Sequence, residues 1–309
     1  MRLLVTGGAG TLGLQVINHL YSSAQSIHVI DNFATSEVEA LSGFPNVVLH
    51  EGTVASQEVV DNAFLNSKPT HVIHLAASYK DPSDWHEDIS TNISGMANVI
   101  KASEENGVRK IVNVQTVLCY GRPEVLPIGI DAPLRPETSY AITKTAAEQF
   151  LVSCGLPFAS LRLGNVISPG LAIGPIPSFY KKLKNGERVF ATRSVRDFLD
   201  IQDFLALLEL VLIEDSPSGV FNVSSGNGTS MEGIFELVNS YLGGNSQPEI
   251  RDPQPDDIPE IILDPSHTFQ TLGWQARVQL KDSVDSCLKS YDARGVGNIY
   301  SHLKGGDIA

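Results

Sequence analysis

The sequence predicts an α/β fold in which a doubly wound parallel sheet is followed by a smaller, irregular C-terminal lobe. Short runs rich in β-branched residues alternate with longer amphipathic stretches through the first half of the chain. A glycine-rich segment, residues 7–13, directly follows the first of these runs. The second half loses the alternation and is richer in proline and glycine. Strand–helix alternation at this spacing is typical of βαβ units, whose strands pair in parallel.

The first half supplies the predicted sheet and its helices. The expected strands are Arg2–Thr6, Ser26–Asp31, Val47–His50, His71–Leu75, Lys110–Val114 and Phe158–Arg162. The expected helices are Leu12–Ser22, Gln57–Leu65, Asp88–Glu105 and Tyr140–Ser153. In such a sheet, ligands bind at the carboxyl ends of the strands. We therefore expect the functional residues just after these strands.

The second half predicts a loop over residues 169–177 and two helices. The first helix, near Ser178–Asn185, is expected to end at Gly186. The second spans Met231–Leu242, with Thr229 or Ser230 as its N-terminal cap. Segments of this half are expected to leave the sheet and to form a substrate-binding lobe.

Composition limits the possible partners. The chain has 309 residues, of which 42% are hydrophobic and 18% charged, and its net charge is −13. Phosphate groups of a nucleic acid would be repelled by an acidic protein of this kind. Three scattered cysteines and the absence of metal-type Cys/His spacing indicate a reducing compartment and no metal site. We find neither a signal peptide nor a membrane span, so we expect a cytoplasmic location.

The glycine-rich segment predicts a dinucleotide site. Gly7 permits the tight turn after the first strand, Gly10 lets the main chain approach a pyrophosphate, and Gly13 lets the helix pack closely on the strand. Thr11 and Leu12 begin the helix, whose free N–H groups and dipole favour phosphate.

The end of the second strand indicates which dinucleotide binds. Asp31 lies 18 residues after Gly13, near the spacing at which a carboxylate meets the adenosine ribose. A carboxylate there would repel a 2′-phosphate, and no arginine follows within the next four residues. NAD is therefore favoured over NADP.

A tyrosine and a lysine four residues apart predict acid–base chemistry. Tyr140 and Lys144 would share one face of a helix, and a charged lysine there would lower the phenol pKa. The phenolate could take a proton from a sugar hydroxyl while hydride leaves the same carbon. Thr116, after the fifth strand, could hydrogen-bond the substrate oxygen.

With these elements together, the chain resembles the extended short-chain dehydrogenase/reductase family, specifically its nucleotide-sugar epimerases and dehydratases. The resemblance runs over roughly residues 2–275. The matching pieces are Thr6–Gly13, Asp31-Asn32, His74–Ala77, Asn92, Thr116, Tyr120-Gly121, Tyr140, Lys144, Arg162, Asn165, Arg196–Phe198, Phe221-Asn222 and Leu272–Trp274.

The resemblance implies further site residues. It places Asn32, Leu75, Ala76, Ala77 and Asn92 at the cofactor, and Lys144 also at the nicotinamide ribose. It implies that Asn165 and Arg196 hold the diphosphate of the substrate. Alternatively, Arg196 forms a surface ion pair with Asp197 or Asp200. Lys80, in the loop after the fourth strand, either contacts a cofactor or substrate phosphate or lies in a solvated loop.

The change of pattern between the two halves of the chain predicts the domains. Residues 1–165 would form an NAD-binding Rossmann domain to which segments near 195–222 return. Residues 166–309 would mainly form a substrate-binding lobe.

Departures from the family pattern narrow the reaction. Where related 4,6-dehydratases carry Asp-Glu after the catalytic threonine, this chain has Val117-Leu118, which cannot transfer protons. The late arginine that often binds the diphosphate is missing from residues 253–257. The resemblance therefore implies an NAD-dependent 4-epimerase of a nucleotide sugar, with a UDP-sugar expected. The alternatives are a dehydrogenase or ketoreductase that exchanges its cofactor, and a non-catalytic dinucleotide-binding sensor.

We also expect a homodimer, because helices like those at Asp88–Glu105 and Tyr140–Ser153 often pair across a two-fold axis in this family. An apolar face for the pairing could come from Ala141, Ala146, Ala147, Phe150 and Leu151.

Overall fold

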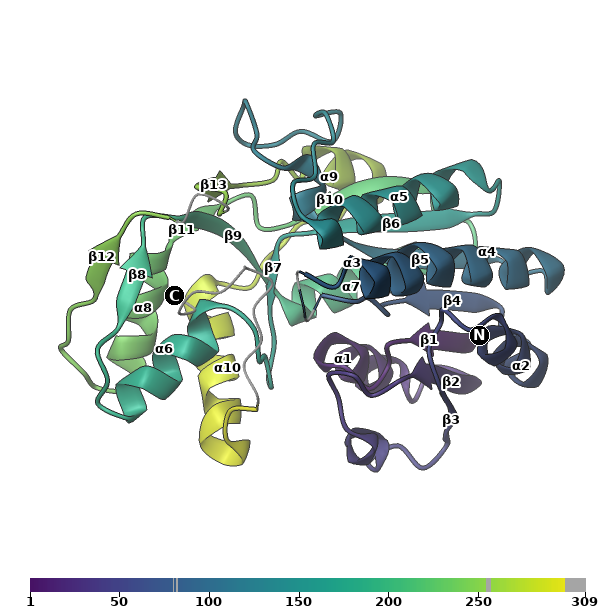
Figure 1. Cartoon of the computed structure of the whole chain (residues 1–309), viewed down its shortest axis with the longest axis horizontal. Coiled ribbons are helices and arrows are strands. Elements are labelled where there is room, and N and C mark those ends of the chain that lie inside the picture. The colour runs from purple at the N-terminus through teal and green to yellow at the C-terminus, as the bar shows by residue number, and fades with distance from the viewer. Residues whose placement is uncertain (80, 82, 254–256, 298–309) are drawn as a thin grey trace. The chain divides into compact units, whose positions relative to one another are not determined.

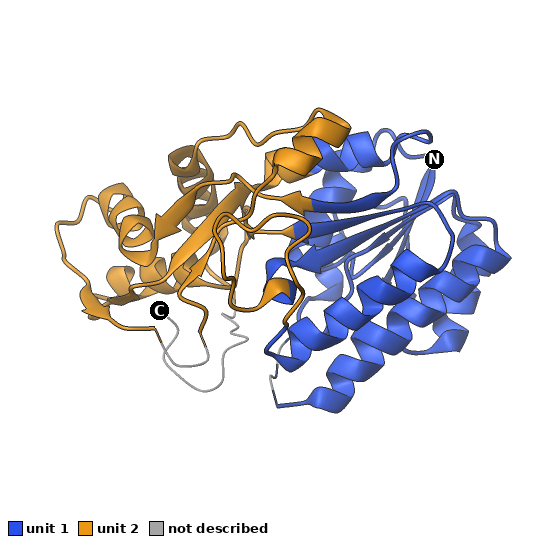
Figure 2. Cartoon of the chain, turned by 90° about the horizontal axis from the view of Figure 1, so that it is seen from above, with its two compact units in different colours: residues 1–119, 136–162, 205–221 blue, residues 120–135, 163–204, 222–309 orange. Residues whose placement is uncertain are grey.

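The computed structural model describes residues 1–79, 81, 83–253 and 257–297 (Figure 1). It divides into two compact units, coloured separately in Figure 2. Unit 1 comprises Met1–Cys119, Pro136–Arg162 and Leu205–Phe221, and unit 2 comprises Tyr120–Arg135, Leu163–Phe204 and the chain from Asn222 onward. Within the described part of the chain, no helix combines the length and apolar character needed to cross a membrane.

A seven-stranded sheet carries the first unit. Its strands are β1 (Arg2–Thr6), β2 (Ser26–Asp31), β3 (Val47–Glu51), β4 (His71–His74), β5 (Lys110–Thr116), β6 (Phe158–Leu163) and β10 (Gly219–Val223). Their order is β10-β6-β5-β4-β1-β2-β3, and β1 pairs in parallel with both β2 and β4. The strand order therefore reverses at β1, where ligands bind in doubly wound sheets. The predicted fold class and six predicted strands are confirmed.

The main helices of this unit begin and end where local chemistry dictates. They are α1 (Thr11–Leu20), α2 (Gln57–Ser67), α4 (Gly95–Glu105), α5 (Ser139–Ser153) and α7 (Ile201–Val211), with 3₁₀ turns η1 (Val38–Leu41) and η3 (Val117–Tyr120). Ser56 caps α2 by accepting from the Val59 N–H, and Thr138 caps α5 by accepting from the Ala141 N–H. Helix α4 packs against both α2 and α5.

The helix predicted over Asp88–Glu105 is interrupted. It consists of a short helix α3 (Trp85–Asp88), a π-helical turn η2 (Ile89–Ser94) and α4. The wider turn accompanies a tertiary contact: buried Asn92 donates to the Thr143 hydroxyl of α5 at 3.0 Å. π-Helical turns of this kind frequently occur at functional sites. The prediction of one continuous helix was wrong because sequence periodicity carries no sign of such an insertion.

Unit 2 contains strands that the sequence analysis did not predict. Strands β7 (Asn165–Ile167), β11 (Gly228–Ser230) and β13 (Glu260–Ile261) all pair with β9 (Val195–Asp200). A second, two-stranded sheet pairs β8 (Phe190–Thr192) with β12 (Glu249–Arg251). Most of these strands are too short to show an alternating pattern.

The helices of unit 2 partly match their predicted bounds. They are α6 (Pro175–Lys184), α8 (Met231–Tyr241), α9 (Ser266–Leu272) and α10 (Leu280–Arg294). Ser230 caps α8 by accepting from the Gly233 N–H, as predicted. Helix α6 begins earlier than the predicted Ser178, because proline is well tolerated in the first turn of a helix.

The apolar face proposed for dimerisation is also corrected. Ala141, Ala147 and Leu151 are buried within the protein, and the latter two belong to the core beneath α5. Ile142 and Phe150, on the other side of the helix, are about half exposed, at 50% and 51%. The apolar residues of α5 lie on two faces, and the sequence alone did not show which one packs inward.

Candidate active site

The glycine turn brings β1 close to the segment after β4. Gly7 adopts a positive φ of 68°, and a Cβ there would lie 2.8 Å from the Ala76 nitrogen. A Cβ on Gly13 would clash with the carbonyl oxygen of Gly7. Both positions therefore require glycine, and the turn has the geometry predicted for a dinucleotide site.

The N-terminus of α1 is suited to an anion. Gly10 is its capping residue, and no side chain caps the helix. No acidic residue lies in the first turn, which Thr11 and Leu12 begin. Main-chain N–H groups and the helix dipole thus favour negative charge here, which fits the pyrophosphate of a dinucleotide.

Asp31 lies at the end of β2 and is buried. One oxygen accepts from the Ala9 N–H at 2.9 Å, and the other accepts from the Phe33 N–H and the Ser36 hydroxyl. A carboxylate has about four acceptor positions, so one on the Ala9-bound oxygen is left for a ribose hydroxyl. Asn32 is exposed and accepts from the Ala34 N–H.

The segment after β4 is tied to β1 and to α5. The Leu75 and Ala76 N–H groups donate to the carbonyl and the hydroxyl oxygen of Thr6, at 3.0 and 3.2 Å. Ala77 follows them directly. Asn92 exchanges hydrogen bonds with the main chain of Ser78 and donates to α5. Lys80 lies outside the described residues.

The three predicted catalytic residues come from two neighbouring elements of unit 1. Thr116 ends β5, and its hydroxyl oxygen accepts from the Leu118 N–H at 3.2 Å. Tyr140 and Lys144 lie one turn apart on α5. The buried Lys144 ammonium donates to the Val114 carbonyl at 2.7 Å. Since β5 and α5 are in contact, these residues are brought together within one unit.

The acid–base balance differs from the sequence-based expectation. Burial raises the pKa of the Tyr140 phenol, and the neighbouring Tyr79 and Asp88 raise it further. Burial lowers the pKa of Lys144 to about 8, against the opposing charge of Glu148. The expectation that Lys144 lowers the pKa of Tyr140 is therefore not met in this structure.

Asp88 is an unusual neighbour of Tyr140. It ends α3, which packs on α5, and its carboxyl group is 1% exposed. Neither of its oxygens has a hydrogen-bond partner among the described residues. Sequence analysis assigned no role to Asp88, because a single aspartate in a helical pattern gives no signal.

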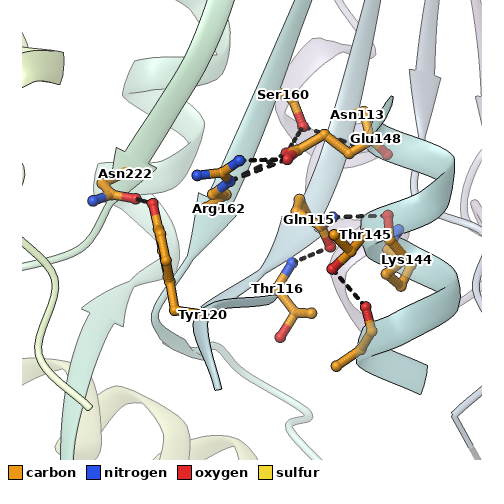
Figure 3. A network of polar contacts seen from close by, with 11 residues as sticks. Asn113, Gln115, Thr116, Tyr120, Lys144, Thr145, Glu148, Ser160, Arg162 and Asn222 are labelled. Atoms are coloured by element: carbon orange, nitrogen blue, oxygen red, sulfur yellow. Dashed lines mark hydrogen bonds and ion pairs between the residues drawn. The ribbon is translucent and has the colours of Figure 1, made fainter. Parts of the chain in front are cut away.

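A buried ionic network lies further along α5 (Figure 3). Glu148, one turn after Lys144, accepts from the Arg162 guanidinium at 2.6 Å and from the Ser160 hydroxyl at 2.7 Å. Asn113 of β5 donates to that hydroxyl. Arg162 was noted only as part of the family pattern, and Glu148 was not noted. The network connects α5 to β5 and β6 through buried polar groups.

Asn165 and Arg196 belong to unit 2. Asn165 begins β7, and Arg196 lies on β9. The Arg196 guanidinium bonds the Asp257 carboxylate at 2.5 Å and the carbonyls of Val195 and Pro259. Its partner is therefore Asp257, not Asp197 or Asp200. This pairing joins residues 61 positions apart, which no local pattern could reveal.

Known proteins resemble this chain along most of its length. The model of the NAD dependent epimerase/dehydratase family matches residues 3–224. The Bordetella bronchiseptica enzyme WbmG, crystallised in complex with NAD and UDP, is 49% identical, with a TM-score of 0.93 and 98% of each chain covered.

Two UDP-glucose 4-epimerases are more distant. That of Halalkalibacterium halodurans is 28% identical over 90% of this chain and 91% of its own. The Thermotoga maritima enzyme, solved with UDP-glucose, is 27% identical with a TM-score of 0.88, and 95% of this chain and 99% of that chain are covered.

Proposed function

Since the chain belongs to the NAD-dependent epimerase/dehydratase family, we propose that it interconverts the C4 epimers of a UDP-sugar, with NAD as its cofactor. The family, the enzymatic activity and the NAD cofactor predicted from the sequence are confirmed by the comparisons. The roles of individual residues, given below, form part of the proposal.

One observation carries the assignment of a 4-epimerase. Thr116, Tyr140 and Lys144 lie on two contacting elements, and the residues after Thr116 are Val117 and Leu118. These apolar side chains stand where dehydratases place an acid and a base. The site therefore supports oxidation and reduction at one carbinol but supplies no such pair for eliminating water.

The residues of unit 1 fit the cofactor. The uncapped start of α1, with Gly7, Gly10 and Gly13, would hold the pyrophosphate, and Asp31 the adenosine ribose. Ala76 and Asn92 would border the nicotinamide half. When bound there, NAD would supply the hydride acceptor and donor that a transient oxidation at C4 requires.

The side chains would manage the proton and the orientation of the sugar. The Leu118 N–H occupies one acceptor position of the Thr116 hydroxyl, so the hydroxyl can donate its own hydrogen to the C4 oxygen. Tyr140 would take the C4 proton and return it once the ketone has presented its other face. The Lys144 ammonium, with two N–H donors beyond the one on Val114, would orient a ribose hydroxyl.

Arg196 would supply the anchor for the diphosphate. The guanidinium has five N–H donors, and three bonds within the described residues use part of them. A diphosphate could therefore bind beside Asp257 or displace it. Asn165 is proposed as a second contact.

We further propose a cytoplasmic homodimer, with the exposed Ile142 and Phe150 of α5 in its interface. Light scattering that finds only a 33.3 kDa species would contradict the dimer.

Proton NMR of the purified protein with a panel of UDP- and dTDP-sugars, without added cofactor, tests the proposed function. We expect the 4-epimer of one UDP-sugar to appear without lasting absorbance at the wavelength of NADH. Turnover that requires added NAD or NADH would instead identify a dehydrogenase or reductase. No turnover in either format would refute the assignment of a nucleotide-sugar substrate.

A further inference from the structure

Gln115 links the two elements that carry the candidate catalytic residues. It precedes Thr116 on β5 and is 2% exposed. Its side-chain oxygen accepts from the Thr116 main-chain N–H at 2.7 Å, and its side-chain nitrogen donates to the Lys144 carbonyl of α5 at 2.8 Å. Figure 3 shows this carboxamide bonded to both residues.

Both bonds end on main-chain atoms of the residues that are to act on the substrate. The Thr116 N–H lies at the very end of β5, where the chain leaves the strand for the η3 turn. The Lys144 carbonyl lies in the turn of α5 that follows Tyr140. A single side chain therefore constrains where the strand ends relative to the helix.

A second bond crosses the same interface in the opposite direction. The Lys144 ammonium donates to the carbonyl of Val114, the residue before Gln115. Two successive residues of β5 are thus tied to one residue of α5, once through its side chain and once through its main chain. Two such bonds resist both sliding and rotation of α5 against β5, which a single bond does not.

We propose that Gln115 is a positioning residue that sets the separation between the Thr116 hydroxyl and the Tyr140–Lys144 pair. This inference rests on the proposed function, because it assigns those three residues to the reaction. A hydroxyl donor and a phenolate must meet one sugar oxygen together, and displacements of about 1 Å can cost about 100-fold in rate. The Leu118 N–H orients the Thr116 hydroxyl itself, so Gln115 fixes the main chain from which that hydroxyl projects.

Substituting an apolar side chain of similar length tests this role. In Gln115→Met both bonds are lost while the volume is nearly kept. We expect kcat to fall about 10- to 100-fold with KM changed less than about twofold, because substrate binding does not depend on this alignment. Gln115→Glu keeps the acceptor for Thr116 but sets a carboxylate oxygen against the Lys144 carbonyl, so its kcat should fall at least as far as that of Gln115→Met.

Asn98→Leu is the matched control. Asn98, in unit 1, also bridges two segments, by donating to the carbonyls of Val54 and Ala55, and among the described residues none of its bonds reaches Thr116, Tyr140 or Lys144. A similar loss of thermal stability with unchanged kcat is expected for this variant. If Gln115→Met lowers kcat no more than Asn98→Leu does, the positioning role is refuted.

Crystal structures of the wild type and Gln115→Met test the same inference without any assumption about the reaction. We expect Thr116 to move relative to Lys144 by about 0.5 Å or more, the tolerance within which catalytic groups must be held. An unchanged separation would overturn the inference, even if the protein is an epimerase. A wild type that epimerises no sugar would overturn the proposed function, while the measured displacement would still decide whether Gln115 positions Thr116.

Discussion

The two units hold their candidate functional groups in different ways. In unit 1, Lys144 and Thr116 are fixed by the Val114 carbonyl and the buried Gln115 amide. In unit 2, the Arg196 guanidinium is paired with a carboxylate of its own chain, Asp257. A main-chain acceptor stays in place when a ligand binds, whereas a carboxylate and a phosphate compete for the same guanidinium hydrogens.

If the proposed roles hold, this difference separates the geometry of the reaction from the binding of the nucleotide. Unit 1 would then supply a fixed arrangement, and unit 2 a contact that can be exchanged. Substitutions in unit 1 should therefore change kcat or stability, whereas substitutions at Arg196 should change KM. Four predictions test this separation, beginning with the largest expected effect.

Removing the phenol oxygen of Tyr140 should have the largest effect on the rate. For Tyr140→Phe we expect kcat to fall about 10³-fold with little change in KM, because the proton of the C4 hydroxyl loses its acceptor. Epimer formation followed by NMR measures both constants. Tyr21→Phe, in the same unit, is the control, since the Tyr21 hydroxyl contacts only the Asn46 N–H in the described structure. If Tyr140→Phe retained a tenth of the wild-type activity, the Tyr140 phenol would be excluded as the base.

Breaking the buried ion pair between Glu148 of α5 and Arg162 of β6 should have the largest effect on stability. Glu148→Gln leaves the Arg162 guanidinium buried without its counter-charge, so the free energy of unfolding should fall by about 3 kcal/mol. Urea denaturation measures this change. The control is Glu214→Gln, which breaks an exposed pair with Arg109 and should change little. An equal fall in the free energy of unfolding in the two variants would show that the buried network does not stabilise unit 1 more than an exposed ion pair does.

A smaller effect is expected in unit 2. Arg196→Leu should raise KM for the nucleotide sugar about tenfold, the value of one charge-assisted hydrogen bond, with kcat within about twofold of the wild type. Initial rates over a range of substrate concentrations separate the two constants. A fall in kcat at unchanged KM would contradict the division of roles between the units.

The smallest effect should come from Asp88. Its negative charge contributes to raising the pKa of Tyr140, so Asp88→Asn should lower that pKa and increase the phenolate fraction at neutral pH. The kcat/KM of this variant should therefore exceed that of the wild type at every pH below the phenol pKa, while the limb set by Lys144, near pH 8, should stay where it is. Asp81→Asn, on the exposed loop before α3, is the control. An unchanged or lower kcat/KM in Asp88→Asn would contradict this prediction.

Local chemistry made much of unit 1 predictable. The Gly7 turn depends on φ values and close contacts that only glycine satisfies, so its geometry could be predicted from sequence. The spacing of Tyr140 and Lys144 is a property of any helix. In unit 2, the predicted cap at Ser230 likewise acts within three residues.

Features that depend on distant residues could not be predicted. Asp257 pairs with Arg196 across 61 positions, and Gln115 contacts Lys144 across 29. The buried position of Ala141 and Leu151 depends on which face of α5 meets the core, and both faces carry apolar residues. Strands as short as β8 and β13 are set by their partners, not by their own sequences.

The π-helical turn at Ile89–Ser94 takes up one residue more than an α-helical turn, because its hydrogen bonds span five residues instead of four. Deleting one residue within this turn would let regular α-helix run through it, with Trp85–Asp88 on nearly the same side of the helix as before. The buried Asp88 would then keep its place near Tyr140, whereas the residues of the turn, Asn92 among them, would be redistributed around the axis. A single-codon deletion at this point would thus remove the contact of Asn92 with α5 while the segment before it keeps its direction.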